Sequence, residues 1–400
     1  MTGAMYAAIA GLKTHMSKLN VVGNNIANVN TNGYKSQRTV FRDALYTMYS
    51  GGSDGTTTTG SKNPSQIGYG SQVSSIDLNM TTGNYSPGNA MDCMLYGDGF
   101  FLVGNKTTAA TITGTNPDSF KALKLTRVGD FRFGADGYLV DGKGNPVYGF
   151  MNTGVDKNGN PKVSDQLVAI RLPKTEMAYF DAAGKEVTKA DALEDPATGK
   201  LKDGFKCAST IRYPVAEDTK NNNTAIALKD AVAKKANDTD PDVELPFASL
   251  DSISIDTKSG RISGTVKDTD TVITIGYLAV GNPTNPDGVT HEGESYYSCS
   301  DGAGDLKITM LGGVAADLGI TYVNGSLDNK DNDQDFAYNR DAAIGSAGST
   351  TLYTGGLEGS NVDLATEISE MITTQRGYQA NTRIITVTDS MLEELVNMKR

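Results

Sequence analysis

The residues that most often perform chemistry in enzymes are few in this chain of 400 residues. Only two histidines occur, His15 and His291, which makes a multi-histidine metal site or a Ser-His-Asp triad hard to build. His15 precedes an apolar helical position by one residue, so we expect it to be solvated. The HExxH and GxxxxGK[ST] motifs are absent. The sequence therefore predicts no catalytic residue, no cofactor-binding residue and no metal ligand, and we expect a protein that is not an enzyme.

Three cysteines lie far apart in the chain, and none belongs to a CxxC motif. A zinc site or a thioredoxin-like motif is therefore not indicated, and an odd, sparse set argues against a disulfide scaffold. Cys93 stands in an apolar run and is expected to be a buried, small hydrophobic residue. Cys207 and Cys299 have polar neighbours, and we expect both to be exposed thiols.

Two acidic stretches resemble the start of a calcium-binding loop. Residues 331–335 and 156–160 alternate oxygen-bearing side chains, but Phe336 and Pro161 occupy the sixth position, where the loop needs glycine. We therefore expect polar loops at both places, with no bound metal and no cofactor.

The composition excludes several other classes of protein. Lys plus Arg number 36 and Asp plus Glu 47, which gives a net charge of −11 and argues against binding to nucleic acid or to an anionic membrane surface. No apolar run approaches a membrane span, and we expect neither membrane insertion nor a classical secretory leader. The length predicts two to three domains, and 45 glycines favour a chain rich in turns and β-structure.

The first 30 residues carry apolar side chains in alternating steps of four and three, with Gly23 at the missing position. This spacing is typical of a helix that packs along a heptad seam. The predicted N-terminal seam residues are Met5, Ile9, Leu12, Met16, Leu19 and Ile26.

Residues 361–400 repeat the pattern over a greater length. Ser360 and Asp363 have the spacing of a capping box, and 39 residues from 361 to 399 would form a helix about 58 Å long. The predicted C-terminal seam residues are Leu364, Ile368, Met371, Tyr378, Ile385, Leu392 and Val396. The N-terminal helix is the obvious partner, but it is shorter. Three arrangements remain open: a helical hairpin within one chain, lateral packing in an assembly, and a coiled coil with an unrelated partner.

The middle of the chain has the period of β-strands, broken by turns such as Gly134-Ala135-Asp136-Gly137. The expected fold class is mixed α and β, with paired N- and C-terminal coiled-coil-like helices that carry inserted, mainly-β domains. The expected division is a terminal helical domain (1–30 and 361–400), a connecting segment (31–74 with 341–360), a first β domain (75–150 and 291–340) and an inserted outer, mainly-β domain (151–290).

Two short segments at the ends of the chain resemble the signatures of bacterial flagellar axial proteins. Val22–Lys35 is similar to the N-terminal signature, in which an Asn-rich stretch follows the seam and Asn32-Gly33 makes a tight turn. Gly356–Leu364 is similar to the C-terminal signature. Gly88–Val103 and Leu125–Phe150 resemble the first β domain of the family. The signature residues are Asn24, Asn25, Asn28, Asn30, Thr31, Gly33, Tyr34 and Lys35.

Within that family, Arg383–Arg400 resembles the end of the hook protein. The resemblance implies a homopolymer that forms the flexible tubular joint between motor and filament, lies outside the cell and encloses the export channel. Its implied partners are further copies of itself, the distal rod, the hook-capping protein, the hook–filament junction protein and the flagellar type III export gate. Phe41 and Leu45 match a short export element. The alternatives are a long flagellar distal-rod protein or, in another class, a secreted β-rich adhesin or enzyme.

Overall fold

The computed structural model describes most of the chain and divides it into two compact units. It describes residues 2–106, 123–155, 161–163, 167–187, 189–195, 200–213, 215–216, 228–229, 246–267, 271–304, 306–310, 321–323, 326–328 and 350–398. Unit 1 comprises residues 1–84 and 359–400, and unit 2 comprises residues 85–358. The two calcium-like stretches, 156–160 and 331–335, lie outside the described residues.

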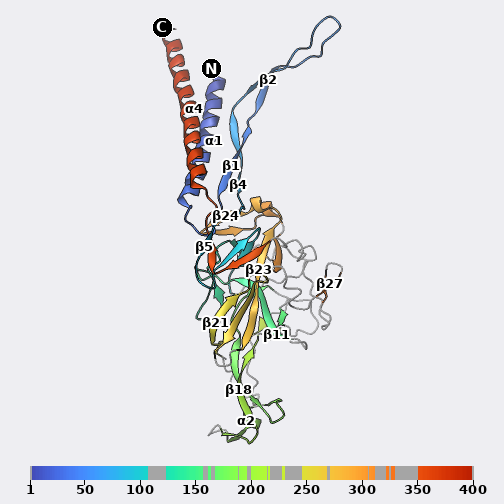
Figure 1. Ribbon diagram of the computed structural model, residues 1–400. Helices are drawn as coiled ribbons and strands as arrows, with labels where there is room; N and C mark the ends of the chain where they lie inside the picture. The colour runs from blue at the N-terminus through green and yellow to red at the C-terminus, as the bar shows by residue number, and fades with distance from the viewer. Residues whose placement is uncertain are drawn as a thin grey trace. The chain divides into compact units, whose positions relative to one another are not determined.

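Unit 1 contains the two expected terminal helices and a long two-stranded ribbon (Figure 1). Its elements are α1 (Thr2–Ala27), β1 (Gln37–Asp43), β2 (Tyr46–Ser50), β3 (Ser65–Gly68), β4 (Ser71–Leu78) and α4 (Leu364–Met398). Strand β1 pairs with β4 and β2 pairs with β3, both antiparallel, so the chain runs out along one side of the ribbon and returns along the other. Within the described residues, no helix has the length and apolar character needed to cross a membrane.

The start of α4 is capped by Asp363 and not by the expected capping box. The Asp363 carboxylate accepts hydrogen bonds from the Ala365 backbone N–H at 3.1 Å and from the Thr366 hydroxyl at 2.6 Å. Ser360 Oγ instead accepts the Val362 N–H at 3.3 Å, too early in the chain to satisfy the helix. The carboxylate also lies at the positive end of the helix dipole, and this lowers the free energy of the first turn.

Unit 2 is built on an eleven-stranded sheet, with smaller two- and three-stranded sheets beside it. The central strand β23 pairs antiparallel with β7, β11, β22 and β26. The elements of unit 2 are β5 (Tyr85–Pro87), β6 (Cys93–Tyr96), β7 (Phe100–Val103), β8 (Lys124–Thr126), β9 (Arg132–Phe133), β10 (Leu139–Val140), β11 (Tyr148–Val155), β12 (Pro161–Val163), β13 (Val168–Ala169), β14 (Lys174–Phe180), β15 (Glu186–Val187), α2 (Lys189–Ala192), β16 (Leu193–Asp195), β17 (Lys200–Leu201), β18 (Lys206–Arg212), β19 (Val215–Ala216), β20 (Leu228–Lys229), β21 (Leu250–Ile255), β22 (Arg261–Val266), β23 (Val272–Pro283), η2 (Pro286–Gly288), β24 (Thr290–Gly293), β25 (Tyr296–Ser298), η3 (Asp301–Ala303), β26 (Leu306–Met310), β27 (Thr321–Val323), β28 (Ser326–Asp328), β29 (Thr351–Thr354) and β30 (Gly356–Glu358).

The sheet crosses two of the domain boundaries expected from the sequence. Strands β21, β22 and β23 fall within 151–290, the range assigned to an outer domain, yet they join the same sheet as β7 and β8. The boundary at residues 74 and 75 falls inside β4. Backbone hydrogen bonding across a sheet is not visible as a composition change along the chain, which explains why these boundaries differ. The expectation that residues 151–290 form an outer domain stays a prediction.

The core of unit 2 lies against this sheet and contains the expected buried thiol. Cys93 packs among Leu95, Phe101 and Val280, and burial raises the pKa of its thiol well above the ordinary range. The expectation of an exposed Cys299 is wrong: the side chain is buried and its Sγ lies 3.4 Å from the Gly304 carbonyl oxygen. Cys207, on β18, is partly buried.

Candidate functional site

The two terminal helices pack on one another antiparallel, through small and polar side chains. A Cβ on Gly11 would lie 2.7 Å from Asn381 Nδ2, and a Cβ on Gly377 would lie 2.7 Å from the His15 ring. Nearer the base of the pair, Lys18 Nζ forms an ion pair with Glu370 at 2.9 Å. The expectation of a solvated His15 is therefore wrong, because its ring fills the space that Gly377 leaves.

This contact does not use the apolar seam predicted from the sequence. The contact row on α1 runs through Ala8, Gly11 and His15, one residue before Ile9, Leu12 and Met16. On α4 the residues that contact α1 also precede the predicted seam residues by one. Glu367 precedes Ile368, Glu370 precedes Met371, and Gly377 precedes Tyr378. One residue turns a helix by about 100°. Because the helices are antiparallel, the same turn carries both apolar rows to the same side of the pair.

The two apolar rows remain partly open to solvent in the single chain. Five seam residues are between 37% and 65% exposed, namely Met16, Leu364, Ile368, Leu392 and Val396. The other eight, Met5, Ile9, Leu12, Leu19, Ile26, Met371, Tyr378 and Ile385, are partly buried. Every residue of α4 from 389 to 398 is exposed. The pair therefore presents a largely apolar side that nothing in the described part of this chain covers completely.

The opposite side of α1 is covered by the ribbon. A Cβ on Gly70 would lie 2.9 Å from Ala10 Cβ and 3.0 Å from the Ala7 carbonyl oxygen, and the Thr14 and Ser71 hydroxyls are 3.2 Å apart. Ala7, Ala10 and Thr14 each precede by one a residue in the row of α1 that faces α4. They therefore point about 100° away from that row, on the side opposite to the apolar seam. Consecutive residues of α1 thus face the ribbon, α4 and the open apolar side in turn.

At the base of the pair, Asn25 joins segments from both ends of the chain. Its side chain is 1% exposed, and its Nδ2 donates to the Gln37 carbonyl oxygen at 2.8 Å and to Glu367 Oε1 at 2.9 Å. Its Oδ1 accepts the Gln37 N–H at 3.0 Å and the Tyr34 hydroxyl at 3.1 Å. Asn24 Nδ2 also donates to the Tyr34 hydroxyl, at 3.0 Å. The NH₂ group and the carbonyl oxygen of the Asn25 side chain therefore each make two hydrogen bonds.

A second asparagine, Asn361 in the C-terminal signature, also forms hydrogen bonds with segments near the other end of the chain. Its Oδ1 accepts the Ser36 N–H at 2.7 Å, and its Nδ2 donates to the backbone carbonyls of Asn79 and Thr81. Buried Lys35 also donates to the Thr81 carbonyl, at 2.9 Å. The other signature residues shape the loop before β1: Asn28, Asn30, Thr31 and Gly33, of which Gly33 has φ of 69°. The signature residues therefore hold the two ends of the chain together.

The carboxylate of Glu367 is a perturbed charge in this cluster. Burial raises its pKa, assisted by the neighbouring carboxylates Glu370 and Asp363, while Asn25 and Lys18 oppose the rise. Its Oε2 is buried and has no hydrogen-bond partner among the described residues. Burial of Tyr34, together with the nearby negative charge of Glu367, raises the pKa of Tyr34 to about 12.

The candidate export element lies on the ribbon. Phe41 follows a bulge in β1 and its ring makes an edge-on contact with His15 at 6.1 Å between centroids, whereas Leu45 is 82% exposed. The pentapeptide 51–55 has the GxSxG pattern of a nucleophile elbow, but it follows β2 and begins no helix. Within the described residues, no group of acidic, His and Cys side chains is arranged to hold a metal.

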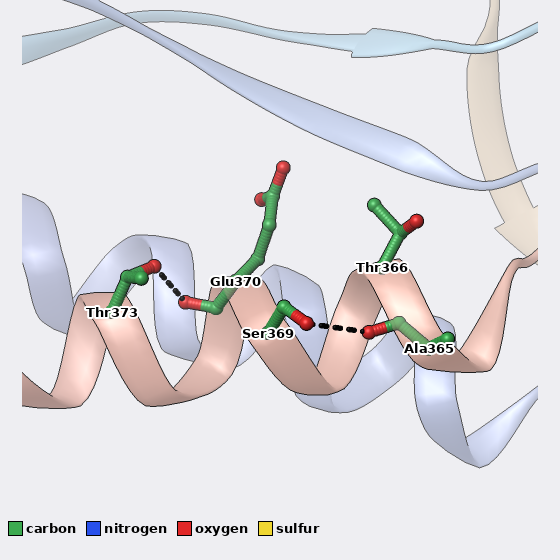
Figure 2. Close-up of a pocket in the computed structure, with 5 residues that line it drawn as sticks. All are labelled: Ala365, Thr366, Ser369, Glu370 and Thr373. Carbon is green, nitrogen blue, oxygen red and sulfur yellow. Dashed lines mark hydrogen bonds between the residues drawn. The ribbon is translucent and has the colours of Figure 1, made fainter.

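The hollow in Figure 2 is lined by a single helix and holds no catalytic arrangement. It has a volume of about 370 Å³ and is bounded by α4 residues 365–373. Two hydroxyls there bond back to their own helix: Ser369 donates to the Ala365 carbonyl and Thr373 to the Glu370 carbonyl, both at 2.9 Å. These hydroxyls are already used, so the surface is a polar helix face.

In unit 2, strand β30, the first part of the C-terminal signature, is held by a buried ion pair. Arg127 and Glu358 are 0% and 1% exposed and lie 3.4 Å apart. Arg127 also donates to the Gly97 carbonyl at 2.8 Å, and its guanidinium lies over the Phe100 ring. Burial lowers the pKa of Arg127. A charge in such a place is tolerated only when it is paired, so each partner requires the other.

Comparison with known proteins matches both ends of the chain to flagellar families. Residues 5–35 match the flagella basal body rod protein family, and residues 353–398 match the C-terminal family of the flagellar basal body rod proteins FlgE, FlgF and FlgG. These ranges contain Asn25, Tyr34, Asn361 and Glu367, but not Ser36, Gln37, Asn79 or Thr81. Both ends of the chain are therefore similar to flagellar rod and hook proteins. The family resemblance expected from the sequence is confirmed by these matches.

Several relatives are similar over the whole chain. The flagellar basal-body rod protein FlgG of Bacillus subtilis is 27% identical, and the flagellar hook protein FlgE of Borreliella burgdorferi is 29% identical; each alignment covers all of both chains. A crystal structure of the Helicobacter pylori hook protein FlgE2 aligns with 57% of this chain and 96% of its own, at 11% identity and a TM-score of 0.29.

Proposed function

We propose that this protein is the subunit of the flagellar hook. Many copies polymerise into a flexible tube that transmits motor torque to the filament and encloses the export channel. The single observation that supports the proposal is the apolar side of the α1–α4 pair. Its two rows lie side by side, are partly open in the single chain, and reach to the end of α4.

Burial of these rows supplies the free energy of assembly. Full burial of a large apolar side chain contributes about 1.5–3 kcal/mol, so seam residues that are roughly half exposed contribute about half as much each, and contacts along the whole length of both rows are needed to offset the entropy lost on association. The rows then pack against the helices of neighbouring copies in a coiled-coil-like manner and form the inner tube. In the proposed subunit the first β domain forms the middle shell and the region 151–290 the outer surface.

The other proposed partners meet the tube at its ends. The distal rod supports its base, the hook-capping protein covers the growing tip and the hook–filament junction protein follows it. The subunit reaches the tip through the flagellar type III export gate, which recognises the element formed by Phe41 and Leu45. It therefore acts outside the cell.

A long distal-rod protein is the second candidate. The full-length similarity to the FlgG rod protein of Bacillus subtilis favours it as much as similarity to FlgE proteins favours the hook. A rod transmits torque without bending, so the two candidates differ in the stiffness of the polymer that they predict.

Two experiments test the proposal. Purified protein at high concentration is examined by electron microscopy, and we expect hollow tubes that curve. Deletion of the gene is expected to leave cells with rods but without hooks. Straight, rigid tubes together with loss of the distal rod would support the rod protein instead, and a protein that forms no tube would refute both.

A further inference from the structure

A cavity lies in unit 1 where the base of the helix pair meets the ribbon. It is lined by residues of α1, of β1, of β4 and the segment after it, and of the first two turns of α4, and it has a volume of about 370 Å³. Sites for small molecules range from about 300 to 1,000 Å³. A single helix lines the hollow in Figure 2, whereas this cavity is bounded by elements from both ends of the chain. A small molecule bound there would contact both ends.

Two polar groups in the cavity wall have hydrogen-bonding capacity that the chain does not fill. Glu367 Oε2 and Thr39 Oγ1 are buried, and neither has a hydrogen-bond partner among the described residues. The terminal torsion of a glutamate is broad, so a turn of the carboxylate presents Oε2 to the cavity, and a threonine hydroxyl hydrogen rotates to suit its partner. An unbonded buried acceptor costs free energy, so a ligand that brings N–H donors is stabilised there.

The charges of the wall favour a cation. Glu367 and Glu370 lie three residues apart on one face of α4, and Lys18 forms an ion pair with Glu370 at 2.9 Å. Arg38 also borders the cavity, but its side chain is 76% exposed and forms an ion pair with Asp77 at 3.7 Å. Among the described residues, the ionised Glu367 carboxylate is therefore left without an ion-pair partner. It attracts a cationic ligand and repels an anionic one.

The apolar part of the wall favours an organic cation over a metal ion. Val21, Val22 and Leu78 are buried side chains that line the cavity, and they provide a surface for methylene groups. Ca²⁺ and Mg²⁺ require about six oxygen ligands, which such a wall does not supply. An ammonium group on a short alkyl chain matches both parts of the wall, with donors at one end and methylenes at the other.

We propose that this cavity binds a small primary alkylammonium ion, whose N–H groups donate to Glu367 and to the Thr39 hydroxyl while its alkyl chain packs against Val22 and Leu78. The site goes beyond the proposed function and does not depend on assembly, because every residue that lines it belongs to unit 1 of a single chain. The bound cation compensates the charge of Glu367, which otherwise opposes the folded state at neutral pH. Binding therefore stabilises the junction of α4 with α1 and β1.

Calorimetric titration of the unchanged protein with n-butylammonium chloride tests the proposal directly. We expect saturable binding at one site with a Kd of about 1 mM or below. 1-Butanol has the shape without the charge, and tetramethylammonium has the charge without N–H donors; each is expected to bind at least about ten-fold more weakly. A net charge of −11 attracts any cation weakly, so equal binding of the two cations, or binding that does not saturate, overturns the proposal.

Substitutions provide the second test. Glu367→Gln keeps the size of the side chain but removes its charge, and it is expected to weaken butylammonium binding at least about ten-fold. Thr39→Val replaces the hydroxyl by a methyl group and is expected to weaken binding about three- to ten-fold. Glu393→Gln, on an exposed part of α4, and Thr47→Val, on β2, are the matched controls and are expected to bind as the unchanged protein does. Circular dichroism checks that all four fold alike. If the first two bind as the controls do, the proposal is wrong.

The pH dependence of binding is a readout that a purely structural role of Glu367 would not give. Burial raises the pKa of Glu367, assisted by Glu370 and Asp363 and opposed by Lys18, while Tyr34, with a pKa of about 12, stays neutral. An alkylammonium ion stays charged up to about pH 10. Affinity is therefore expected to rise as the pH rises through the raised pKa of Glu367, and this rise is expected to be largely lost in Glu367→Gln. A flat profile in the unchanged protein contradicts the assignment of Glu367.

Hydrogen exchange locates the bound ion. At a concentration of about nine times its Kd, a ligand that binds only the closed junction lowers the open population about ten-fold. Amides in the first two turns of α4 are therefore expected to exchange about ten-fold more slowly, whereas those of β23 in unit 2 are expected to be unchanged. Equal slowing in both units would be a general effect of the salt and would refute the site.

Discussion

Replacement of Asn25 by alanine is expected to separate the two ends of the chain. The substitution removes two donated and two accepted hydrogen bonds, with Gln37, Tyr34 and Glu367 as partners. Each such bond contributes about 0.5–1.5 kcal/mol net, and more where a buried partner is left without a bond. We therefore expect unit 1 to lose about 2–5 kcal/mol of stability, with the first turns of α4 released from α1.

Hydrogen exchange and urea unfolding measure this loss. The amides of the first two turns of α4 are expected to exchange about 30-fold faster or more in Asn25→Ala, and the far-UV circular dichroism transition is expected to shift to lower urea. Asn24→Ala is the matched control. Asn24 is exposed, and its Nδ2 makes one long-range bond, to Tyr34, so the expected loss is about 1 kcal/mol or less.

Asn25→Asp separates the loss of hydrogen bonds from the effect of charge. The variant keeps an acceptor for the Tyr34 hydroxyl, but it places a second carboxylate against Glu367. It is expected to be less stable than Asn25→Ala at neutral pH and to recover as acid protonates the pair. The reasoning is refuted if Asn25→Ala and Asn24→Ala differ by less than about 0.5 kcal/mol, the usual scatter of a surface substitution.

Three further outcomes are expected. A Cβ at position 377 would lie 2.7 Å from the His15 ring, so Gly377→Leu is expected to overpack the helix contact, to cost about 1–3 kcal/mol and to lower the melting temperature. The pKa of Glu367 is raised in the folded state, so its contribution to stability is complete below the ordinary pKa of glutamate and is lost as pH rises through the raised value. Glu367→Gln is therefore expected to flatten the fall in melting temperature as the pH rises above the ordinary pKa of glutamate, about 4.3, and an unchanged pH profile would contradict this. Arg127→Met leaves Glu358 buried without this ion-pair partner and is expected to lower the free energy of unfolding by about 3–5 kcal/mol. Adding Glu358→Leu is expected to restore part of that stability, as measured by urea unfolding. A double variant that is no more stable than Arg127→Met would count against the pair.

The sequence predicts the helices and the location of the signature cluster well, because both depend on local signals. The heptad spacing places α1 and α4 within a few residues of their observed bounds. The Asn-rich segment is expected to turn, and it does so before β1. The bonding of Asn25 could not be predicted, since its partner Glu367 lies 342 residues away in the chain. The burial of Cys299 was missed for the same reason: its neighbours in sequence are polar, but the fold encloses it.

The largest difference between sequence and structure concerns which row of residues joins the helices. A search for apolar side chains selects Ile9, Leu12 and Met16, and it passes over glycine because glycine has no side chain to bury. Yet glycines at Gly11 and Gly377 allow two helices to approach closely and make room for Asn381 and His15. The signal that could have found this row is the spacing of small and polar residues one position earlier, in the same steps of three and four.

This displacement has a consequence for assembly. If the large apolar residues had packed between α1 and α4, the pair would be satisfied within one chain, and its outer sides would be polar. Because the contact uses the row one residue earlier on both antiparallel helices, the large side chains are turned together toward one side. The ribbon covers the other side through Gly70 and Ser71. A chain built in this way folds with a few hydrogen bonds and close glycine contacts, and in the proposed polymer its apolar rows are left available for contact with further copies.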